Sequence, residues 1–178
     1  MVAGLLAPTC HNATPSCLQT DFMRLHNIPL QTGITCRIRS LGGDSRIAKR
    51  LAQMGILPGM EVTIVRTGPL GNPLELAIGS GQAIALRAEE TAALDCELVS
   101  LPLNLVRPDG RTWRVRALQG GARYRHKLSA TGLQPGSLVR VEDARPWRLR
   151  LLPNDALVRL GQGEAEKLIL EPVDSSHA

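Results

Sequence analysis

Short segments of the chain alternate between apolar and polar residues, which is the pattern of β-strands buried on one face. The first such segment is 36–41, in which Cys36, Ile38 and Ser40 are expected to point inward and Arg37 and Arg39 outward. Further strands are expected over residues 61–65, 74–78, 83–87 and 96–99. The pattern therefore predicts a mostly β chain.

A helix is expected between the first two of these strands, because apolar residues recur there at helical spacing. The residues of this stripe are Ile47, Leu51 and Met54. Asp44 or Ser45 can cap the start of the helix, and Gly55 is placed to end it. A shorter helical turn is expected over 89–94, before the last strand.

The whole set of elements occurs twice. Residues 33–64 and 110–141 match at a shift of 77 without a gap, and 12 of these 32 positions are identical. Further on, Leu86 aligns with Val158 at a shift of 72, so the second copy is five residues shorter (77 − 72 = 5). The missing residues fall at the loop 69–73, and surface loops tolerate such changes in length.

The repeat predicts the domain organisation. Each copy has about 70 residues, with five strands and one short helix inserted after the first strand, so two small β-barrel-type modules in tandem are expected. The expected divisions are a leader over 1–22, a first domain over 23–100, a second and diverged domain over 101–173, and a tail over 174–178. No linker separates the copies, so we expect them to touch.

Composition restricts the class of protein. Aromatic residues make up only 2% of the chain, so the core must be aliphatic and the stacking platforms of single-strand nucleic-acid binders are lacking. No apolar run approaches the roughly 18 residues of a membrane span. The first residues lack a basic segment, and those before Cys10 fit a lipid-modified cysteine poorly. A cytoplasmic protein is expected.

Four residues near the start could in principle gather around a metal ion. They are Cys10, His11, Cys17 and His26. Their spacing matches no standard site, so we predict no metal and no cofactor. The other two cysteines align with large apolar residues of the second copy, Cys36 with Trp113 and Cys96 with Leu168. Both are therefore expected to be buried thiols of the core.

Catalytic signatures are lacking in the sequence. Nucleophilic catalysis needs a nucleophile, a base and an orienting group together, and the four histidines are scattered along the chain. Gly79-Ser80-Gly81 is explained by a hairpin turn, and His126 is expected on an exposed helix face. We predict that the protein is not an enzyme and has no catalytic residue.

Positive charge is concentrated in the second copy. Residues 24–99 carry 8 Lys/Arg against 7 Asp/Glu, and residues 101–173 carry 13 against 7. Arg123, Arg125 and Lys127 of the second helix are therefore candidate partner contacts. A surface of this kind can bind nucleic acid, an acidic partner or an anionic membrane face. The alternative interpretation is a solvated protein exterior that is rich in arginine.

Three runs of the first copy, over 49–62, 68–75 and 83–90, resemble the signature of the FeoA family, the ferrous iron transport protein A family. The resemblance covers about residues 25–99 and implies an SH3-like barrel. It also implies a small cytoplasmic protein associated with FeoB, the membrane transporter of ferrous iron, and brings no catalytic residues. The second copy lacks the loop of the first and is expected to be a diverged member.

The prediction that follows is a cytoplasmic, non-catalytic accessory protein that binds and modulates a FeoB-type transporter, peripheral to the membrane at most. The loop is its second candidate contact, formed by Pro69, Leu70, Gly71, Asn72 and Pro73. The alternative is an SH3-like, nucleic-acid-associated or regulatory module that acts through the arginines of the second copy. Intramolecular pairing of the two copies and the oligomeric state stay open at this point.

Overall fold

The computed structural model describes residues 31–79 and 81–173. The first half contains β1 (Thr35–Leu41), α1 (Ser45–Gln53), β2 (Glu61–Thr67), the short 3-10 helix η2 (Pro69–Gly71), β3 (Leu74–Ile78), β4 (Gln82–Leu86), α2 (Ala88–Ala92) and β5 (Leu94–Pro102). The second half contains η3 (Leu103–Leu105), β6 (Thr112–Leu118), α3 (Ala122–Ala130), β7 (Leu138–Ala144), β8 (Trp147–Leu152), β9 (Leu157–Leu160), α4 (Gln162–Ala165) and β10 (Leu168–Pro172). The element order of the two halves is the same, as the repeat predicts.

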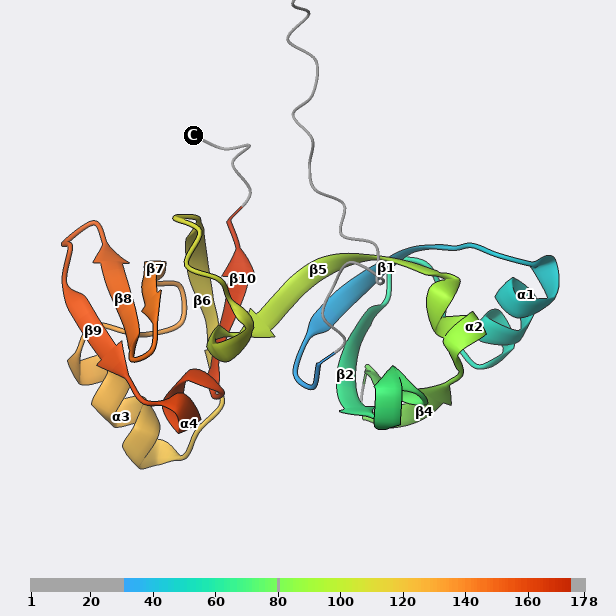
Figure 1. Cartoon of the computed structure of the whole chain (residues 1–178), viewed down its shortest axis with the longest axis horizontal. Coiled ribbons are helices and arrows are strands. Elements are labelled where there is room, and N and C mark those ends of the chain that lie inside the picture. Colours follow the sequence, from blue (N-terminus) through green and yellow to red (C-terminus); the bar gives the residue numbers. More distant parts are fainter. Residues whose placement is uncertain (1–30, 80, 174–178) are drawn as a thin grey trace, which may run out of the picture.

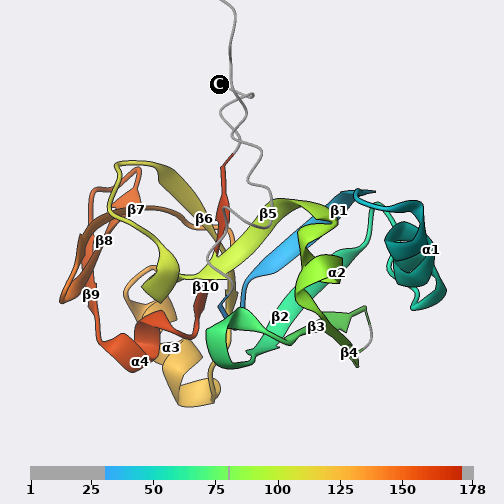
Figure 2. The ribbon, with the colours of Figure 1, turned by 45° about the vertical axis from the view of Figure 1, so that its right-hand side comes forward.

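All ten strands belong to one antiparallel sheet with the order β4-β3-β2-β1-β5-β10-β6-β7-β8-β9. Each half is a five-stranded module, and the two modules form separate lobes (Figure 1). Strand β5 runs from one lobe to the other and pairs with both β1 and β10. The turned view shows the same bridge (Figure 2). The mostly β fold is therefore confirmed. The last strands of the two modules, β5 and β10, pair with each other.

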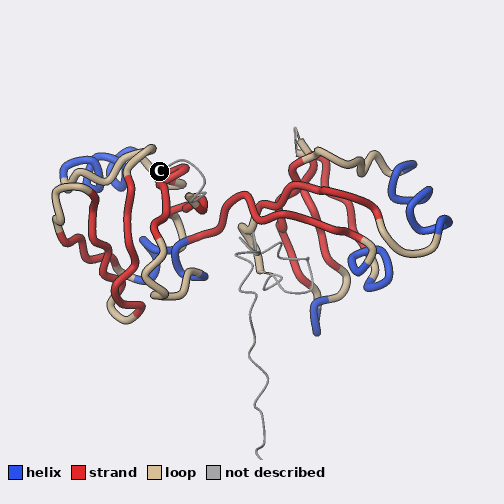
Figure 3. The backbone as a smooth tube through the Cα atoms, turned by 90° about the horizontal axis from the view of Figure 1, so that it is seen from above, coloured by secondary structure: helices blue, strands red, loops and turns tan. Residues whose placement is uncertain are grey.

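Helix α1 forms where the sequence predicts it, and local chemistry explains both of its ends. The Asp44 carboxylate accepts a hydrogen bond from the backbone N–H of Arg46 at 3.0 Å and so caps the first turn. At the other end Gly55 has a φ of +84°, a left-handed conformation that side chains disfavour. The chain then turns back, and the Ile56 N–H donates to the Leu51 carbonyl at 3.0 Å. Figure 3 shows α1 at the end of the first module that lies far from the second module.

The core is mostly aliphatic, as the low aromatic content requires, and it also includes Trp113 and Trp147. Leu51 and Leu128, at matched positions of the two copies, are 0% and 1% exposed. Cys36 and its counterpart Trp113 are 1% and 7% exposed, which confirms that this position is buried in both modules.

The predicted inward orientation of Ser40 is wrong. Ser40 is exposed, although strict alternation from Cys36 and Ile38 places it in the core. The pairing of β1 with β5 shifts register between Ile38 and Ser40, because Ile38 lies opposite Cys96 while Ser40 lies opposite Asp95. A bulge of this kind changes which residues face the core beyond it. The Ser40 hydroxyl instead donates to the Asp95 carboxylate at 3.2 Å.

The alignment of the second half of each copy is also corrected. Leu86 lies opposite Leu74, the first residue of β3. Leu160 lies opposite Trp147, the first residue of β8, so Leu86 and Leu160 occupy equivalent positions. The true shift there is therefore 74 (160 − 86), and not 72, so up to this point the second copy is three residues shorter (77 − 74 = 3), and not five. Cys96 consequently corresponds to Leu170, and not to Leu168. Leu170 is fully buried and Cys96 is 2% exposed, so the prediction of a core cysteine still holds.

The difference in length lies where the modules connect their second and third strands. In the first module residues 68–73 make this connection through η2, whereas residues 145 and 146 suffice between β7 and β8. The last strand of the first module is longer than the expected 96–99, because β5 continues to Pro102 and joins the second module.

Candidate functional site

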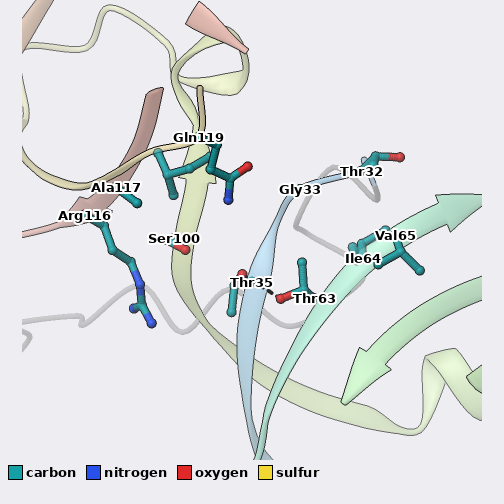
Figure 4. A pocket seen from close by; sticks show the side chains of 11 residues that line it. Thr32, Gly33, Thr35, Thr63, Ile64, Val65, Ser100, Arg116, Ala117 and Gln119 are labelled. Atoms are coloured by element: carbon teal, nitrogen blue, oxygen red, sulfur yellow. Dashed lines mark hydrogen bonds between the residues drawn. The ribbon is translucent and has the colours of Figure 1, made fainter. Parts of the chain in front are cut away.

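A cleft of about 280 Å³ lies where the two modules meet. Its walls come from β1 and β2 of the first module, the bridging strand β5, and β6 with β10 of the second (Figure 4). The lining residues are Thr32, Gly33, Thr35, Thr63, Ile64, Val65, Ser100, Arg116, Ala117, Gln119 and Ile169. The duplication therefore creates a concave surface that neither module has alone.

An ion pair links the modules beside this cleft. Nη2 of Arg116, on β6, lies 3.2 Å from Oε2 of Glu61, on β2. Arg37 donates to the other oxygen of the same carboxylate at 2.8 Å. The hydrogen bond from Arg37 is the largest influence on the pKa of Glu61 and lowers it. Burial opposes this shift, and the charge of Arg116 adds to it, so the pKa stays below its ordinary value.

The repeat explains why Arg116 crosses to the other module. Its counterpart Arg39 pairs with Glu97 of its own module at 2.7 Å. Arg116 has the matching acid Glu171 at 3.7 Å, but Arg114 holds that carboxylate at 3.2 Å. In the first module a second acid, Glu61, pairs with the neighbouring arginine, Arg37. The residue at the position of Glu61 in the second copy is Leu138. The change from an acid to leucine in the repeat is the signal that could have indicated this contact.

Hydroxyl, amide and aliphatic groups line the cleft together with one arginine. The hydroxyls of Thr35 and Thr63 hydrogen-bond to each other at 2.9 Å, and Ser100 is 2% exposed. The lining contains no pairing of a nucleophile with a general base. Within residues 31–79 and 81–173, no three His, Cys, Asp or Glu side chains come together as metal ligands.

The loop 69–73 is held in shape by its own backbone. The N–H of Gly68 donates to the Pro73 carbonyl at 2.9 Å, and the N–H of Gly71 donates to the Gly68 carbonyl at 3.0 Å. A Cβ atom on Gly68 would lie 2.1 Å from the Asn72 carbonyl oxygen, so only glycine fits there. Pro69, Asn72 and Pro73 are exposed. The structure thus presents the loop as an ordered, accessible tip, and its contact role stays a prediction.

The three predicted contacts on α3 differ from one another. Nζ of Lys127 lies 2.5 Å from Oε1 of Glu164 on α4, and Arg125 donates to the Gly120 carbonyl at 2.6 Å. Arg123 is exposed and makes no ion pair among the described residues. The hydrogen bond from Lys127 lowers the pKa of Glu164, aided by the backbone N–H of Gly161. Of the three side chains, Arg123 is therefore the one not engaged within the module.

The pairing of Lys127 with Glu164 has an equivalent in the first module. Arg50 occupies the position of Lys127 and lies 3.0 Å from Glu90 of α2. Glu90 and Glu164 each accept a hydrogen bond from the backbone N–H at the start of their own short helix, at 2.8 and 3.0 Å. Each module therefore ties its longer helix to its shorter one through a single carboxylate.

The cysteines of the described chain are structural. Burial raises the pKa of the Cys36 thiol to about 12 and raises that of Cys96 as well. Both stay protonated at neutral pH, whereas a metal ligand or nucleophile must be a thiolate. The leader residues Cys10, His11, Cys17 and His26 lie outside the described residues. His126 is exposed on α3, as predicted.

No helix in residues 31–79 or 81–173 has the length and apolar character needed to cross a membrane. The observed class is a small, mostly β protein built from two five-stranded antiparallel modules, with a helix after the first strand of each.

The sequence of the first module matches the FeoA domain model over residues 23–98. The chain belongs to the FeoA family through this domain. A solution structure of iron(II) transport protein A from Clostridium thermocellum is 30% identical, with 88% of this chain and 91% of that chain covered and a TM-score of 0.45. Zinc-complexed FeoA from Stenotrophomonas maltophilia is 29% identical, with 42% of this chain and 89% of that chain covered and a TM-score of 0.36.

The Stenotrophomonas protein is described as a prokaryotic SH3 domain protein and a candidate activating factor of ferrous iron transport. No curated protein sequence matches the chain.

Proposed function

We propose that this chain is a non-catalytic cytoplasmic accessory protein of ferrous iron transport, which binds the cytosolic part of a FeoB-type transporter. The match of residues 23–98 to the FeoA domain is the observation that carries this proposal. Protein contact is the proposed activity, because the cleft offers hydroxyls and an arginine, and the first module presents an ordered loop.

The first module is proposed to make the specific contact, through the loop 69–73. Its backbone hydrogen bonds fix its shape before binding, so little conformational entropy is lost on docking. The second module replaces this loop with a two-residue connection and so lacks the same tip. The two modules therefore have different roles in this proposal.

The test is direct capture of the transporter's purified cytosolic domain by the full chain, without lipid. One variant replaces residues 68–73 with Arg-Pro, the connection that residues 145 and 146 make in the second module. Since that module folds with the short connection, the graft is expected to keep the fold and abolish capture. A circular dichroism spectrum and melting curve check the fold.

Point variants sharpen this result. Gly68→Ala is expected to weaken capture because the new Cβ would overlap the loop backbone. Gly163→Ala is the matched control, since a Cβ there meets no atom within 4 Å. Capture that survives the graft would exclude the loop as the contact, and failure of the wild-type chain to capture the domain would refute the proposed function.

A further inference from the structure

The outer face of β7, β8 and β9 carries an unusual concentration of arginine. Alternating residues of these strands are buried, among them Val139, Leu149 and Val158, so the residues between them point away from the core. The outward arginines are Arg140, Arg148, Arg150 and Arg159, which we call the arginine face. Strands β8 and β9 lie on the side of the second module that faces away from the first (Figures 1 and 2).

The register of the strands places these arginines directly opposite one another. Arg140 pairs across the sheet with Arg150, and Arg148 pairs with Arg159. Like charges at directly opposed positions destabilise a sheet, and their side chains begin only about 5 Å apart. Folding alone therefore does not favour this arrangement, which suggests an anionic partner.

Two arginines of the face are neutralised within the module and two are not. Glu142 pairs with Arg150, and Asp143 pairs with Arg148. Among the described residues, Arg140 and Arg159 form no ion pair, and both are exposed. The face therefore keeps two positive charges that are free to meet an anion.

The first module provides an internal comparison. By the strand register, the positions of Arg140, Arg148, Arg150 and Arg159 are Thr63, Glu75, Ala77 and Ala85 there. None of these four is basic. The same fold thus does not need arginine at these positions, and the charge is a property that the second copy alone has.

Leucines lie among the arginines on the same face. Leu157 is 45% exposed and lies opposite Arg150, and the outward residues Leu138 and Leu152 lie opposite each other. Exposed leucine gains little beside the phosphates of nucleic acid, and this face has no outward aromatic residue on which a base could stack. Guanidinium groups and apolar side chains together suit the headgroup region of an anionic lipid surface.

We propose that the arginine face of the second module binds the anionic inner surface of the membrane. This inference rests on the proposed function, because a protein docked to the cytosolic part of a membrane transporter lies within reach of that surface. The specific contact would then come from the first module and the electrostatic contact from the second.

The experiment measures co-sedimentation of the full chain with vesicles of phosphatidylglycerol and phosphatidylcholine, against pure phosphatidylcholine. Binding is expected only with the anionic lipid, and it should weaken as salt is raised. Arg140→Ala/Arg159→Ala removes the two arginines without leaving an acid unpaired, and about a tenfold or greater loss of affinity is expected. Lys49→Ala/Arg87→Ala removes the same charge from the first module and should change binding little.

Two further measurements separate the outcomes. Leu157→Ser should weaken vesicle binding if the apolar side chains enter the interface. Equal losses in the two double variants, unchanged binding in Arg140→Ala/Arg159→Ala, or binding of duplex DNA but not of vesicles would each overturn the inference. Transporter capture is assayed without lipid, so failed capture with intact vesicle binding would refute the proposed function and leave the lipid contact standing.

Discussion

Arg116 of the second module and Glu61 of the first form an ion pair at 3.2 Å that joins the two modules. Arg39, the counterpart of Arg116, pairs instead with an acid of its own module. The second copy has Leu138 at the position of Glu61 and so lacks this acid. Divergence of one residue thus left Arg116 available to reach the neighbouring module.

Arg116→Ala should loosen the arrangement of the modules without unfolding either of them. The pair is partly exposed, with side chains 38% and 37% accessible, so the expected loss of stability is below about 1 kcal/mol. Small-angle scattering or residual dipolar couplings would show a wider range of module orientations. Arg66→Ala is the control, since Arg66 pairs with Glu75 of its own module at 3.8 Å. Equal changes in both variants would contradict a linking role for Arg116.

The titration of Glu61 offers a second test of the same contact. Its folded pKa lies below the ordinary value of 4.5, so the stabilisation is present above that value and is lost as the pH falls through the folded pKa. The intermodule pair is therefore intact at neutral pH, and it is lost only when the pH falls through the folded pKa of Glu61, which lies below 4.5. NMR of the side-chain carboxyl carbon should show a low midpoint that rises most in Arg37→Ala and less in Arg116→Ala. A wild-type midpoint at or above 4.5 would rule this out.

Glu90 should be important for the stability of the first module. Its side chain is only 6% accessible, accepts a hydrogen bond from the N–H of Arg87 at 2.8 Å and lies 3.0 Å from Arg50. Glu90→Ala leaves these partners unsatisfied and is expected to cost about 1–3 kcal/mol of unfolding free energy, measured by urea denaturation. Glu89→Ala, one residue away on the exposed side of α2, should cost less than about 0.5 kcal/mol. Similar losses in both variants would argue against the role of Glu90.

The buried cysteines should resist thiol reagents in the folded protein. In a Cys10→Ser/Cys17→Ser variant only Cys36 and Cys96 remain, 1% and 2% exposed. Because burial raises both pKa values, the thiolate that reacts is scarce at pH 8. Labelling by a disulfide reagent should proceed at the rate of unfolding and become rapid in denaturant. Fast labelling in the native state would show that these thiols are accessible.

The sequence alone was sufficient for the local features of each module. The repeat at a shift of 77 predicts two copies of one element order, and the alternation of Cys36 and Ile38 with two arginines predicts the first strand. Asp44, Gly55 and the stripe around Leu51 predict both the position and the ends of α1. These features follow from backbone preferences and from contacts between residues near in sequence, which local patterns encode directly.

Contacts between distant strands were decided only by the tertiary structure. The bulge that turns Ser40 outward and the pairing that aligns Cys96 with Leu170 depend on register, which is set by hydrogen bonds to strands far along the chain. The same holds for β5, which belongs to both modules, and for Arg116, whose partner lies in the other copy. A charge can be counted from the sequence, but whether it is neutralised depends on which acid the fold brings to it. Lys127 meets Glu164, whereas Arg140 lies opposite Arg150 on one side and Thr112 on the other, because strand and helix packing place them there.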